Sequence, residues 1–567
     1  MNWAPTDVDL TEFGVVLVLA LAACIPRFLL ALRLDVVTDE VVYILGAKLY
    51  FPLLLHLRIG AGGWSYNYEH PPFVKLLIGL ALTCNAALGH PLPELVAARM
   101  PSILCGTLLV VALYWLGRDL FGRVVSLLAA LCLAFSPWLV YFSALAYLDM
   151  TMTALITIAF LLMWHAIRKP WLYLLAALLV GLAADSKYTA VLAIPGMILF
   201  TAYYFFLLRP RLPVEQPPRL PWLWWLTAII ASPAIFLAAD PAIWPHPISL
   251  LVHSFRYEWD HSRSGHLTFI AGQYSLHVPH WATLYIVFVK MSAFITIPAA
   301  FFVLFALTQL LRFHLGATNM QTREVASLSF LLIWLVSIVS TFSLLNIVVG
   351  THYELPIAPP LALAGVSGLA MLLRYRKGSL FASTRARPTA VLAAQTRQTM
   401  QQSGGLSINL RTAIIVACLA LLVVGPHLLG LSTVYAAEGY NSEFFHGENT
   451  ALQVAYPGYR EAVQWIVAHT HGQERVGLGA IAGTLSGGSN GVSWLSYNSH
   501  LAGRLTLIEA HPNDHGYPYD YLVWPMHLVQ RGFAIPVPWR WHIVHIVMGG
   551  NTVYSYIAVR SPDTITS

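Results

Sequence analysis

Long apolar segments recur along most of the chain and are separated by short polar loops. A helix needs about 20 mostly apolar residues to cross a bilayer, so this pattern predicts eleven transmembrane helices. We expect them near residues 13–34, 98–117, 124–145, 150–167, 171–185, 188–208, 222–239, 284–311, 326–345, 355–374 and 412–432. The further apolar segment 74–90 is expected to lie at the outer face or dip into it.

The basic residues indicate how these helices are oriented. If 74–90 does not span, alternate loops that carry Lys and Arg fall on one side, together with the polar linker 375–411. The positive-inside rule makes this side cytoplasmic. We therefore predict a multi-pass protein of the cell (cytoplasmic) membrane with a cytoplasmic N-terminus. The outer loops 35–97 and 240–283 and the C-terminal region would be extracytoplasmic.

Residues 437–567 lack the long apolar segments of the preceding chain and indicate a second domain. The stretch 458–470 (GYREAVQWIVAHT) has the apolar spacing of a helix. Two strand-like runs, 541–549 and 552–560, flank a Gly-Gly-Asn junction that suits a hairpin. The predicted fold is an all-α polytopic membrane domain, residues 1–436, followed by a small α/β domain, residues 437–567.

Composition excludes several classes of protein. Of the 567 residues, 57% are hydrophobic and 10% charged, whereas soluble chains carry roughly 25% charged residues. A soluble enzyme, a disordered chain and a fibrous protein are therefore excluded. The net charge of +6 does not indicate nucleic-acid binding, because the basic residues lie between apolar segments. The five cysteines lie in apolar segments without CxxC spacing, so no zinc ribbon or redox motif is expected.

Charged residues gather at the predicted outer ends of the helices. Ionisable side chains at membrane depth are costly, so they are candidates for function. Because they come from separate loops toward one face, they indicate a site and not a file of charges through the bilayer. They are Asp35, Asp39, Glu40, Glu69, His70, Lys75, Asp149, Lys187, Asp240 and His352.

Each candidate also has a structural interpretation. The paired carboxylates Asp39 and Glu40 could supply a general base or bind a cation, or merely end a solvated loop. Asp149 by itself is best explained as a helix N-cap. Lys187 could snorkel to the interface or bind an anionic lipid head group. The prolines after Glu69 and His70 would hold these two residues rigidly.

The outer loop 240–283 is rich in histidine and aromatic residues. Its histidines could include a metal ligand, but their spacing selects none of them. They are His253, His261, His266, His277 and His280. The Trp and Tyr residues fit either an interfacial belt or a surface that stacks on sugar rings.

In this order, the motifs resemble the membrane glycosyltransferases of the C-type superfamily, which use polyprenyl-phosphate sugars. The chain is most similar to the protein O-mannosyltransferase family and to the aminoarabinose lipid A transferases. The resemblance rests on Asp39-Glu40, on Glu69-His70-Pro71-Pro72 with Lys75, on 98–102, Asp149 and 186–189, and on 261–272 and 350–356.

The resemblance implies a role for each of these residues. Asp39, Glu40 and Asp149 would be catalytic. Lys187, His70, Lys75, His352 and Tyr353 would bind the donor phosphate. Glu69 with His266 or His261 would ligate a divalent metal ion, if one is used. The chain departs from the lipid A transferases at His70, where they have lysine, and at Val42, where they have a basic residue. The usual arginine of the late motif is replaced by His352.

The implied reaction moves a sugar from a polyprenyl-phosphate carrier to an acceptor hydroxyl or phosphate on the outer face, with inversion. The acceptor could be a protein, as in protein glycosylation, a lipid, as in lipid A modification, or a cell-envelope glycan. No P-loop or dinucleotide-binding glycine motif is present, so no nucleotide cofactor is expected. A transporter or flippase of a lipid-linked precursor is the alternative, although no internal repeat supports it. A third alternative is a non-catalytic assembly protein of the envelope.

Overall fold

The structure is a computed structural model. It describes residues 10–211, 219–265, 268–317, 320–345, 350–376, 410–433, 440–445, 451–471, 473–480, 493–512, 519–535 and 541–560. The linker between residues 377 and 409, for which we expect a cytoplasmic position, lies outside this part of the chain.

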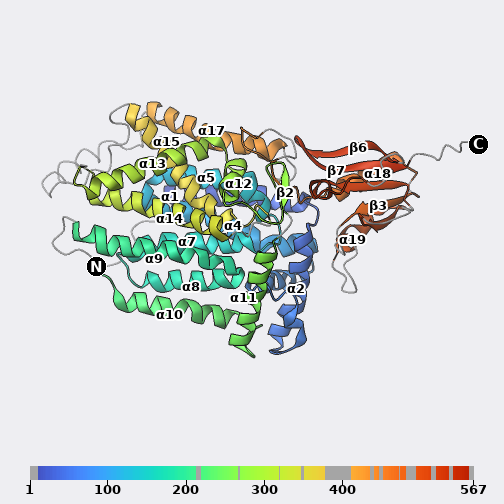
Figure 1. Cartoon of the computed structure of the whole chain (residues 1–567), viewed down its shortest axis with the longest axis horizontal. Coiled ribbons are helices and arrows are strands. Elements are labelled where there is room, and N and C mark those ends of the chain that lie inside the picture. The colour runs from blue at the N-terminus through green and yellow to red at the C-terminus, as the bar shows by residue number, and fades with distance from the viewer. Residues whose placement is uncertain are drawn as a thin grey trace, which may run out of the picture.

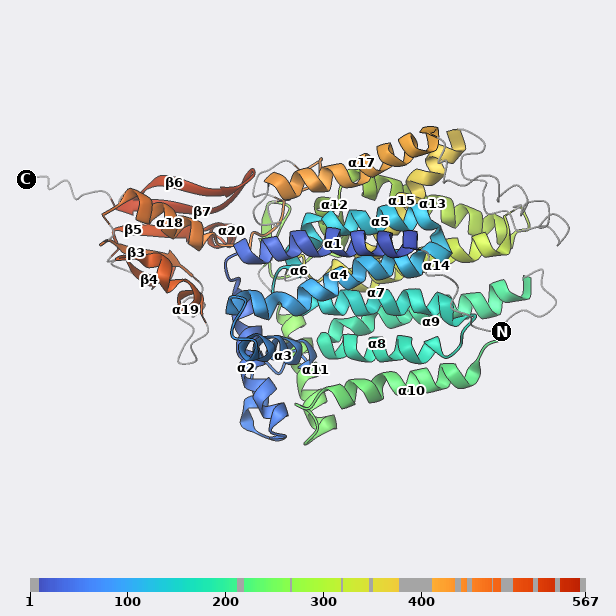
Figure 2. The same ribbon diagram turned by 180° about the vertical axis from the view of Figure 1, so that it is seen from behind.

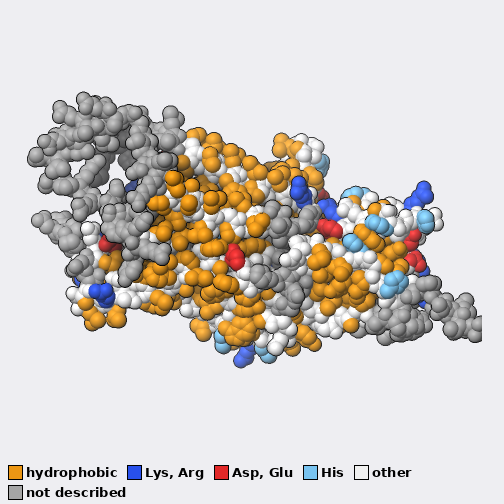
Figure 3. All heavy atoms as spheres, turned by 90° about the horizontal axis from the view of Figure 1, so that it is seen from above, with side chains coloured by type: hydrophobic (Ala, Val, Ile, Leu, Met, Phe, Trp, Pro, Cys, Tyr) orange, Lys and Arg blue, Asp and Glu red, His pale blue; other side chains and the backbone are white. Residues whose placement is uncertain are grey.

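Nine helical segments in the described residues are long and apolar enough to cross a membrane. They run side by side in one bundle (Figures 1 and 2). Along the face seen in Figure 3 the bundle is covered mainly by hydrophobic side chains, as lipid contact requires. The nine are α1 (Leu10–Arg33), α4 (Glu94–Phe121), α7 (Asp149–Ala166), η2–α9–η3–η4 (Tyr188–Arg211), α10 (Trp222–Ala239), α13 (Ala293–His314), α14 (Thr322–Leu345), η5–α15 (Leu355–Ile357, Ala358–Arg376) and α17 (Leu410–Thr433).

The remaining two predicted spans differ from simple helices, so the expected count of eleven is reduced to nine or ten. The span expected at 124–145 is a pair, α5 (Arg123–Phe135) and α6 (Pro137–Ser143), bent by 60°. Pro137 begins α6, and a proline lacks the N–H that would continue the hydrogen-bond ladder of α5. The span expected at 171–185 is α8 (Leu172–Ser186), a short apolar helix that packs between α7 and α10.

The span expected at 284–311 is broken into α12 (Ala282–Lys290) and α13. The Ser292 hydroxyl accepts a hydrogen bond from the Phe294 N–H and caps α13. The Glu443 carboxylate accepts hydrogen bonds from the Ser292 hydroxyl and the Ala293 N–H, both at 2.7 Å. A carboxylate at a helix N-terminus is stabilising, so the chain that follows α17 fixes this break.

Three helices lie across one end of the bundle and not along it. They are α2 (Thr38–Leu55), α3 (Phe73–Ala87) and α11 (Pro247–Ser264) (Figures 1 and 2). The position of α3 agrees with the expectation that 74–90 does not span. The C-terminal domain lies beyond the same end, which we call the domain end.

The C-terminal domain contains a five-stranded mixed sheet in the order β4-β3-β5-β7-β6. The predicted helix is α18 (Tyr459–His469), and the two predicted strands are β6 (Trp541–Gly549) and β7 (Thr552–Arg560). They pair antiparallel through the expected turn, where Gly550 has a φ of 59°. Three strands that the sequence pattern did not reveal are β3 (Arg475–Gly479), β4 (Thr506–Ala510) and β5 (Tyr521–Pro525); β3 pairs in parallel with both β4 and β5. Two short helices are α19 (Trp494–Asn498) and α20 (Met526–Gln530).

Candidate active site

Asp39 lies in the first turn of α2, at the domain end of the bundle. Its half-buried carboxylate accepts a hydrogen bond from the Tyr147 hydroxyl, and the charges of Lys187 and Asp149 act on it. Burial raises the pKa of Asp39, and the neighbouring Asp149 raises it further, while Lys187 lowers it. A raised pKa makes the carboxylate a stronger proton acceptor, as a general base requires.

Asp149 and Lys187 form a buried ion pair beside Asp39. The Lys187 Nζ donates to Asp149 Oδ1 at 2.7 Å, and the two side chains are 3% and 1% exposed. The other oxygen, Asp149 Oδ2, has no hydrogen-bond partner among the described residues. The Lys187 ammonium also lies 3.6 Å from the centre of the Tyr353 ring. Burial alone would lower the pKa of Lys187, but Asp149 and Tyr353 raise it, so Lys187 stays charged.

The structure corrects one expectation from the sequence and excludes one of two alternatives. Asp149 is not the N-cap of α7, because Leu148 occupies that position and makes no capping hydrogen bond with its side chain. Lys187 does not snorkel to the interface, because its side chain is buried; its backbone is extended and connects α8 to η2. Any lysine at a helix end can snorkel, but the buried partner of Lys187 depends on how this chain folds.

Two histidines complete this region but add no positive charge at neutral pH. Burial lowers the pKa of His70 well below its usual value, and Lys187, Lys75 and His352 lower it further. Burial likewise lowers the pKa of His352 to about 4. The His352 ring packs against Phe142 and Tyr147, with both pairs of ring centroids 5.5 Å apart. The two imidazoles can therefore exchange hydrogen bonds with a ligand while Lys187 supplies the charge.

Glu258 is a site residue that the sequence reasoning missed. It lies on α11, and its Oε1 is 3.7 Å from Nδ1 of His70. Burial raises the pKa of Glu258 to about 7, although Lys187 opposes this shift. The signal in the sequence was the helical spacing of large apolar residues within 247–264, which would have placed Glu258 on an interfacial helix. We instead interpreted the segment as a histidine-rich loop.

Glu354 was also missed, although it lies inside the 350–356 motif. Its side chain is fully buried, and burial raises its pKa well above the usual value for glutamate. The charges of Lys187 and Asp149 act on it. Glu354 therefore adds a neutral carboxyl group to this region.

Lys75 is placed differently from the expected donor-binding position. Its ammonium donates to the backbone oxygens of Asn67 and His70, at 2.6 and 2.8 Å, and it is fully buried. Burial lowers the pKa of Lys75 to about 7. Lys75 therefore holds the loop that carries Glu69 and His70, because its ammonium group donates to backbone oxygens of that loop.

The expected metal ligands are only partly described. His266 and the side chain of His261 lie outside the described residues, and Glu69 accepts a hydrogen bond from the Asn67 amide. Among the side chains that the structure describes, no group of three His, Cys, Asp or Glu residues is arranged to hold a metal ion. A metal site at Glu69 thus stays a prediction.

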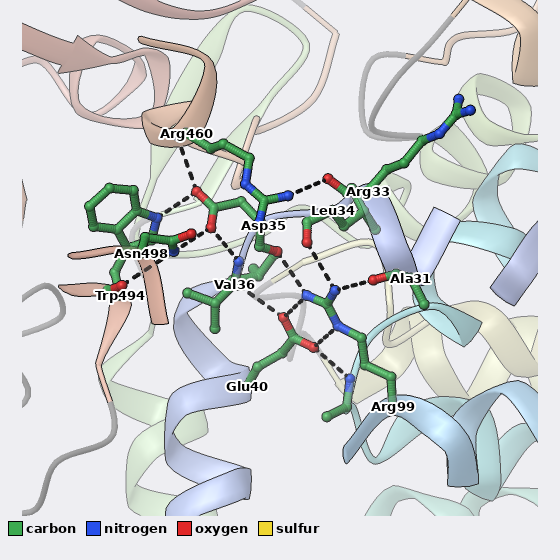
Figure 4. Close-up of polar contacts among 12 residues, drawn as sticks. Ala31, Arg33, Leu34, Asp35, Val36, Glu40, Arg99, Arg460, Trp494 and Asn498 are labelled. Atoms are coloured by element: carbon green, nitrogen blue, oxygen red, sulfur yellow. Dashed lines mark hydrogen bonds and ion pairs between the residues drawn. The ribbon is translucent and has the colours of Figure 1, made fainter. Parts of the chain in front are cut away.

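Glu40 has a structural environment that separates it from its neighbour Asp39. Its carboxylate accepts hydrogen bonds from Arg99 Nε and Nη2 at 2.8 and 2.7 Å, and both side chains are fully buried (Figure 4). The backbone N–H groups of Val37 and Ala146 donate to the same carboxylate. With four donors in place, Glu40 fixes the start of α2 against the loop before Asp149. This geometry suits a positioning residue, and the catalytic role expected for Glu40 stays a prediction.

Arg99 is the second half of this anchor, and it lies within the 98–102 motif. Besides Glu40, its guanidinium donates to the backbone oxygens of Ala31, Leu34 and Asp35, at 2.8, 3.0 and 2.8 Å (Figure 4). These oxygens belong to the end of α1 and the turn into α2. Arg99 therefore joins α1, α2 and α4 at the point from which Asp39 projects.

Comparison with known proteins gives a fold and a resemblance to one family over part of the chain. Residues 69–237 match the family model described as dolichyl-phosphate-mannose-protein mannosyltransferase. None of the curated proteins matches the sequence. The crystal structure of ArnT from Cupriavidus metallidurans in the apo state has a TM-score of 0.50 at 15% identity, over 98% of this chain and 100% of ArnT. ArnT bound to undecaprenyl phosphate has a TM-score of 0.48 at 15% identity, over 99% of each chain.

The matched segment covers the Glu69–Pro72 motif, Lys75, Asp149 and Lys187 and ends within α10. The ArnT likeness extends over the C-terminal domain as well. The chain therefore has the fold of the C-type membrane glycosyltransferases, and over residues 69–237 it resembles the dolichyl-phosphate-mannose-protein mannosyltransferase family.

Proposed function

We propose that this protein is a membrane glycosyltransferase that moves a sugar from a polyprenyl-phosphate carrier to an acceptor. The observation that carries the proposal is the buried Asp149–Lys187 pair beside Asp39, at one end of an apolar bundle. A lipid-linked phosphate is the substrate class that needs both an apolar surface for its tail and a fixed cation for its head group. The family model that matches residues 69–237 is named for such a donor.

Each residue has a role in the proposed reaction. The acceptor oxygen attacks the anomeric carbon, the bond from that carbon to the phosphate oxygen breaks, and polyprenyl phosphate leaves. Asp39 takes the proton of the acceptor hydroxyl. Lys187 stabilises the negative charge that develops on the phosphate. A single displacement inverts the anomeric configuration.

Asp149 keeps Lys187 in place, while its other carboxylate oxygen has no hydrogen-bond partner in the part of the chain that the structure describes. His70, His352 and Tyr353 surround the ammonium and would orient the phosphate through hydrogen bonds and ring contacts. We further propose that transfer occurs on the extracytoplasmic side of the membrane, as the positive-inside rule indicates. A metal ion held through Glu69 would add its positive charge to that of Lys187.

The Lys187→Met variant tests the donor site. We expect donor affinity to fall by about tenfold to a thousandfold, because a hydrogen bond to a charged group is worth roughly 1.5–3 kcal/mol and more in a buried site. The substitution leaves Asp149 buried without its partner, so the Asp149→Asn/Lys187→Met double variant is the control for folding. It should regain stability without regaining affinity. Donor binding by the double variant at wild-type strength would refute the assignment of Lys187.

Glu258 makes the affinity for the donor depend on pH. A sugar phosphodiester keeps one negative charge between pH 6 and 8, but the Glu258 carboxyl, with a pKa of about 7, is neutral below that pH and negative above it. Repulsion should therefore weaken donor binding by about three- to tenfold as the pH rises from 6 to 8. The Glu258→Gln variant should lose most of this dependence. Asp240→Asn, which changes another carboxyl of raised pKa near Lys75, should keep it.

The transporter alternative makes a different prediction in a reconstituted system. A flippase would move the intact lipid-linked sugar between leaflets, whereas the proposed enzyme breaks the bond between sugar and phosphate. Vesicles with purified protein and labelled donor distinguish the two, because the first outcome leaves the label on lipid and the second releases it.

A further inference from the structure

The C-terminal domain contacts the turn that leads into the candidate catalytic helix. Residues 34–37 connect α1 to α2, and all four are buried. Asp39 follows two residues later. Contacts that hold this turn in place therefore also influence the position of the Asp39 carboxylate.

Asp35 in this turn is bonded mainly by the other domain. Its Oδ1 accepts hydrogen bonds from the Asn498 amide at 2.7 Å and from the Val36 N–H at 2.8 Å. Its Oδ2 accepts hydrogen bonds from the Trp494 indole N–H and from the Arg460 N–H (Figure 4). Three of these four donors belong to α18 and α19 of the C-terminal domain.

The arrangement is specific and not a loose surface contact. Asp35 is fully buried, as are Trp494 and Asn498 at 2% exposure. The Arg460 N–H lies in the first turn of α18, where N–H groups lack partners within the helix. Asp35 thus caps a helix of the other domain, and a carboxylate at that position is stabilised by the helix dipole.

The contacts continue from Asp35 toward the candidate active site. Arg99 Nη2 donates both to the backbone oxygen of Asp35 and to Glu40. Glu40 in turn accepts from the N–H of Ala146, next to Tyr147, whose hydroxyl bonds Asp39. Hydrogen bonds and short stretches of backbone therefore link α19, through Asp35, Arg99 and Glu40, to the residues beside Asp39. Figure 4 shows this path from Trp494 and Asn498 as far as Glu40.

We infer that Trp494 and Asn498, through Asp35, are positioning residues that hold Asp39 in its productive place. The inference rests on the proposed function, in which Asp39 accepts the proton of the acceptor. The C-terminal domain then acts on the rate of transfer and not on donor binding, because Trp494 and Asn498 bond the turn before α2, whereas Lys187 is held by Asp149.

The test compares Trp494→Phe and Asn498→Ala with Tyr497→Phe in the full-length protein. Tyr497 lies on the same helix and donates to Glu94 at 2.8 Å, an exposed contact outside the Asp35 cluster. Two quantities are measured: amide hydrogen exchange of residues 34–40, and kcat together with donor affinity. The Val36 and Val37 N–H groups, bonded to Asp35 and Glu40, report directly on the turn.

We expect exchange at residues 34–40 to accelerate by about tenfold or more in Trp494→Phe and Asn498→Ala. Their kcat should fall by about tenfold to a hundredfold, since small displacements of a catalytic group are costly. Donor affinity should stay within about threefold, and Tyr497→Phe should match the wild type within about twofold. Asp35→Asn replaces one carboxylate oxygen, which accepts hydrogen bonds from two N–H groups, by an NH₂ group that can only donate. This variant should behave like Trp494→Phe and Asn498→Ala.

Unchanged exchange in these variants would overturn the inference, and so would faster exchange with wild-type kcat. A parallel loss of donor affinity and kcat would also overturn it, because that would show general damage to the site. Failure of the proposed function would appear instead in the wild type, as no turnover of any donor. In that case, the exchange data still decide whether the C-terminal domain orders the turn.

Discussion

The Asp39→Asn variant should lose nearly all transfer activity while it still binds the donor. General base catalysis contributes about 10²–10⁴ in rate, so kcat should fall by that factor. Donor affinity should change little, because the charge that binds phosphate is on Lys187 and not on Asp39. Transfer by purified wild type and variant, measured beside donor binding, provides the check.

Asp240→Asn is the matched control. Asp240 is buried, but its carboxylate accepts backbone N–H groups and its charge partner is Lys75. It should keep kcat within about threefold of the wild type. If Asp39→Asn transferred sugar at the wild-type rate, Asp39 would not be the base.

The Arg99→Met variant should be the most destabilised of the substitutions considered. It leaves Glu40 buried without its ion-pair partner, and breaking such a pair costs about 3–5 kcal/mol. Three backbone oxygens at the end of α1 and the start of the turn also lose their donor. Unfolding in detergent, followed by loss of helical signal, measures the difference in free energy.

Two further variants make this test specific. Lys48 and Glu94 lie at the same N–O distance, 2.7 Å, but their side chains are 38% and 44% exposed. Lys48→Met should therefore cost less than about 1 kcal/mol. The Glu40→Gln/Arg99→Met double variant should recover part of the loss, because no buried charge is left alone. Equal effects of Lys48→Met and Arg99→Met would contradict the structural role of the Glu40–Arg99 pair.

The long apolar segments of the sequence were sufficient to predict the membrane domain but not its breaks. Each of the eleven expected segments holds apolar helix, since burial in lipid acts on residue type alone. The break before α13 depends on Glu443, about 150 residues further along the chain, which no local pattern reveals. The strands β3, β4 and β5 were missed for a similar reason, because each is only five residues long and gains its partner from distant chain.

For the candidate site too, the sequence identified residues but not the contacts that they make with distant parts of the chain. The sequence identified Asp39, Asp149 and Lys187 as candidates, and the structure brings them together. It could not distinguish Asp39 from Glu40, because their difference arises from Arg99, 59 residues from Glu40. The sequence also did not reveal that Lys75 bonds backbone oxygens of the loop that it follows. The role of Asp35 depends on α18 and α19, which are more than 400 residues away.

In the proposed reaction, this protein breaks the bond between a sugar and a polyprenyl phosphate. To test this reaction, purified protein is incubated with a panel of labelled polyprenyl-phosphate sugars, with and without extracts that supply acceptors. The quantity measured is the fraction of the label that leaves the lipid carrier. We predict that the wild type removes the sugar from at least one donor and that Asp39→Asn does not. Failure of the wild type to bind or to turn over any of these donors would contradict the account, and so would equal release by the variant.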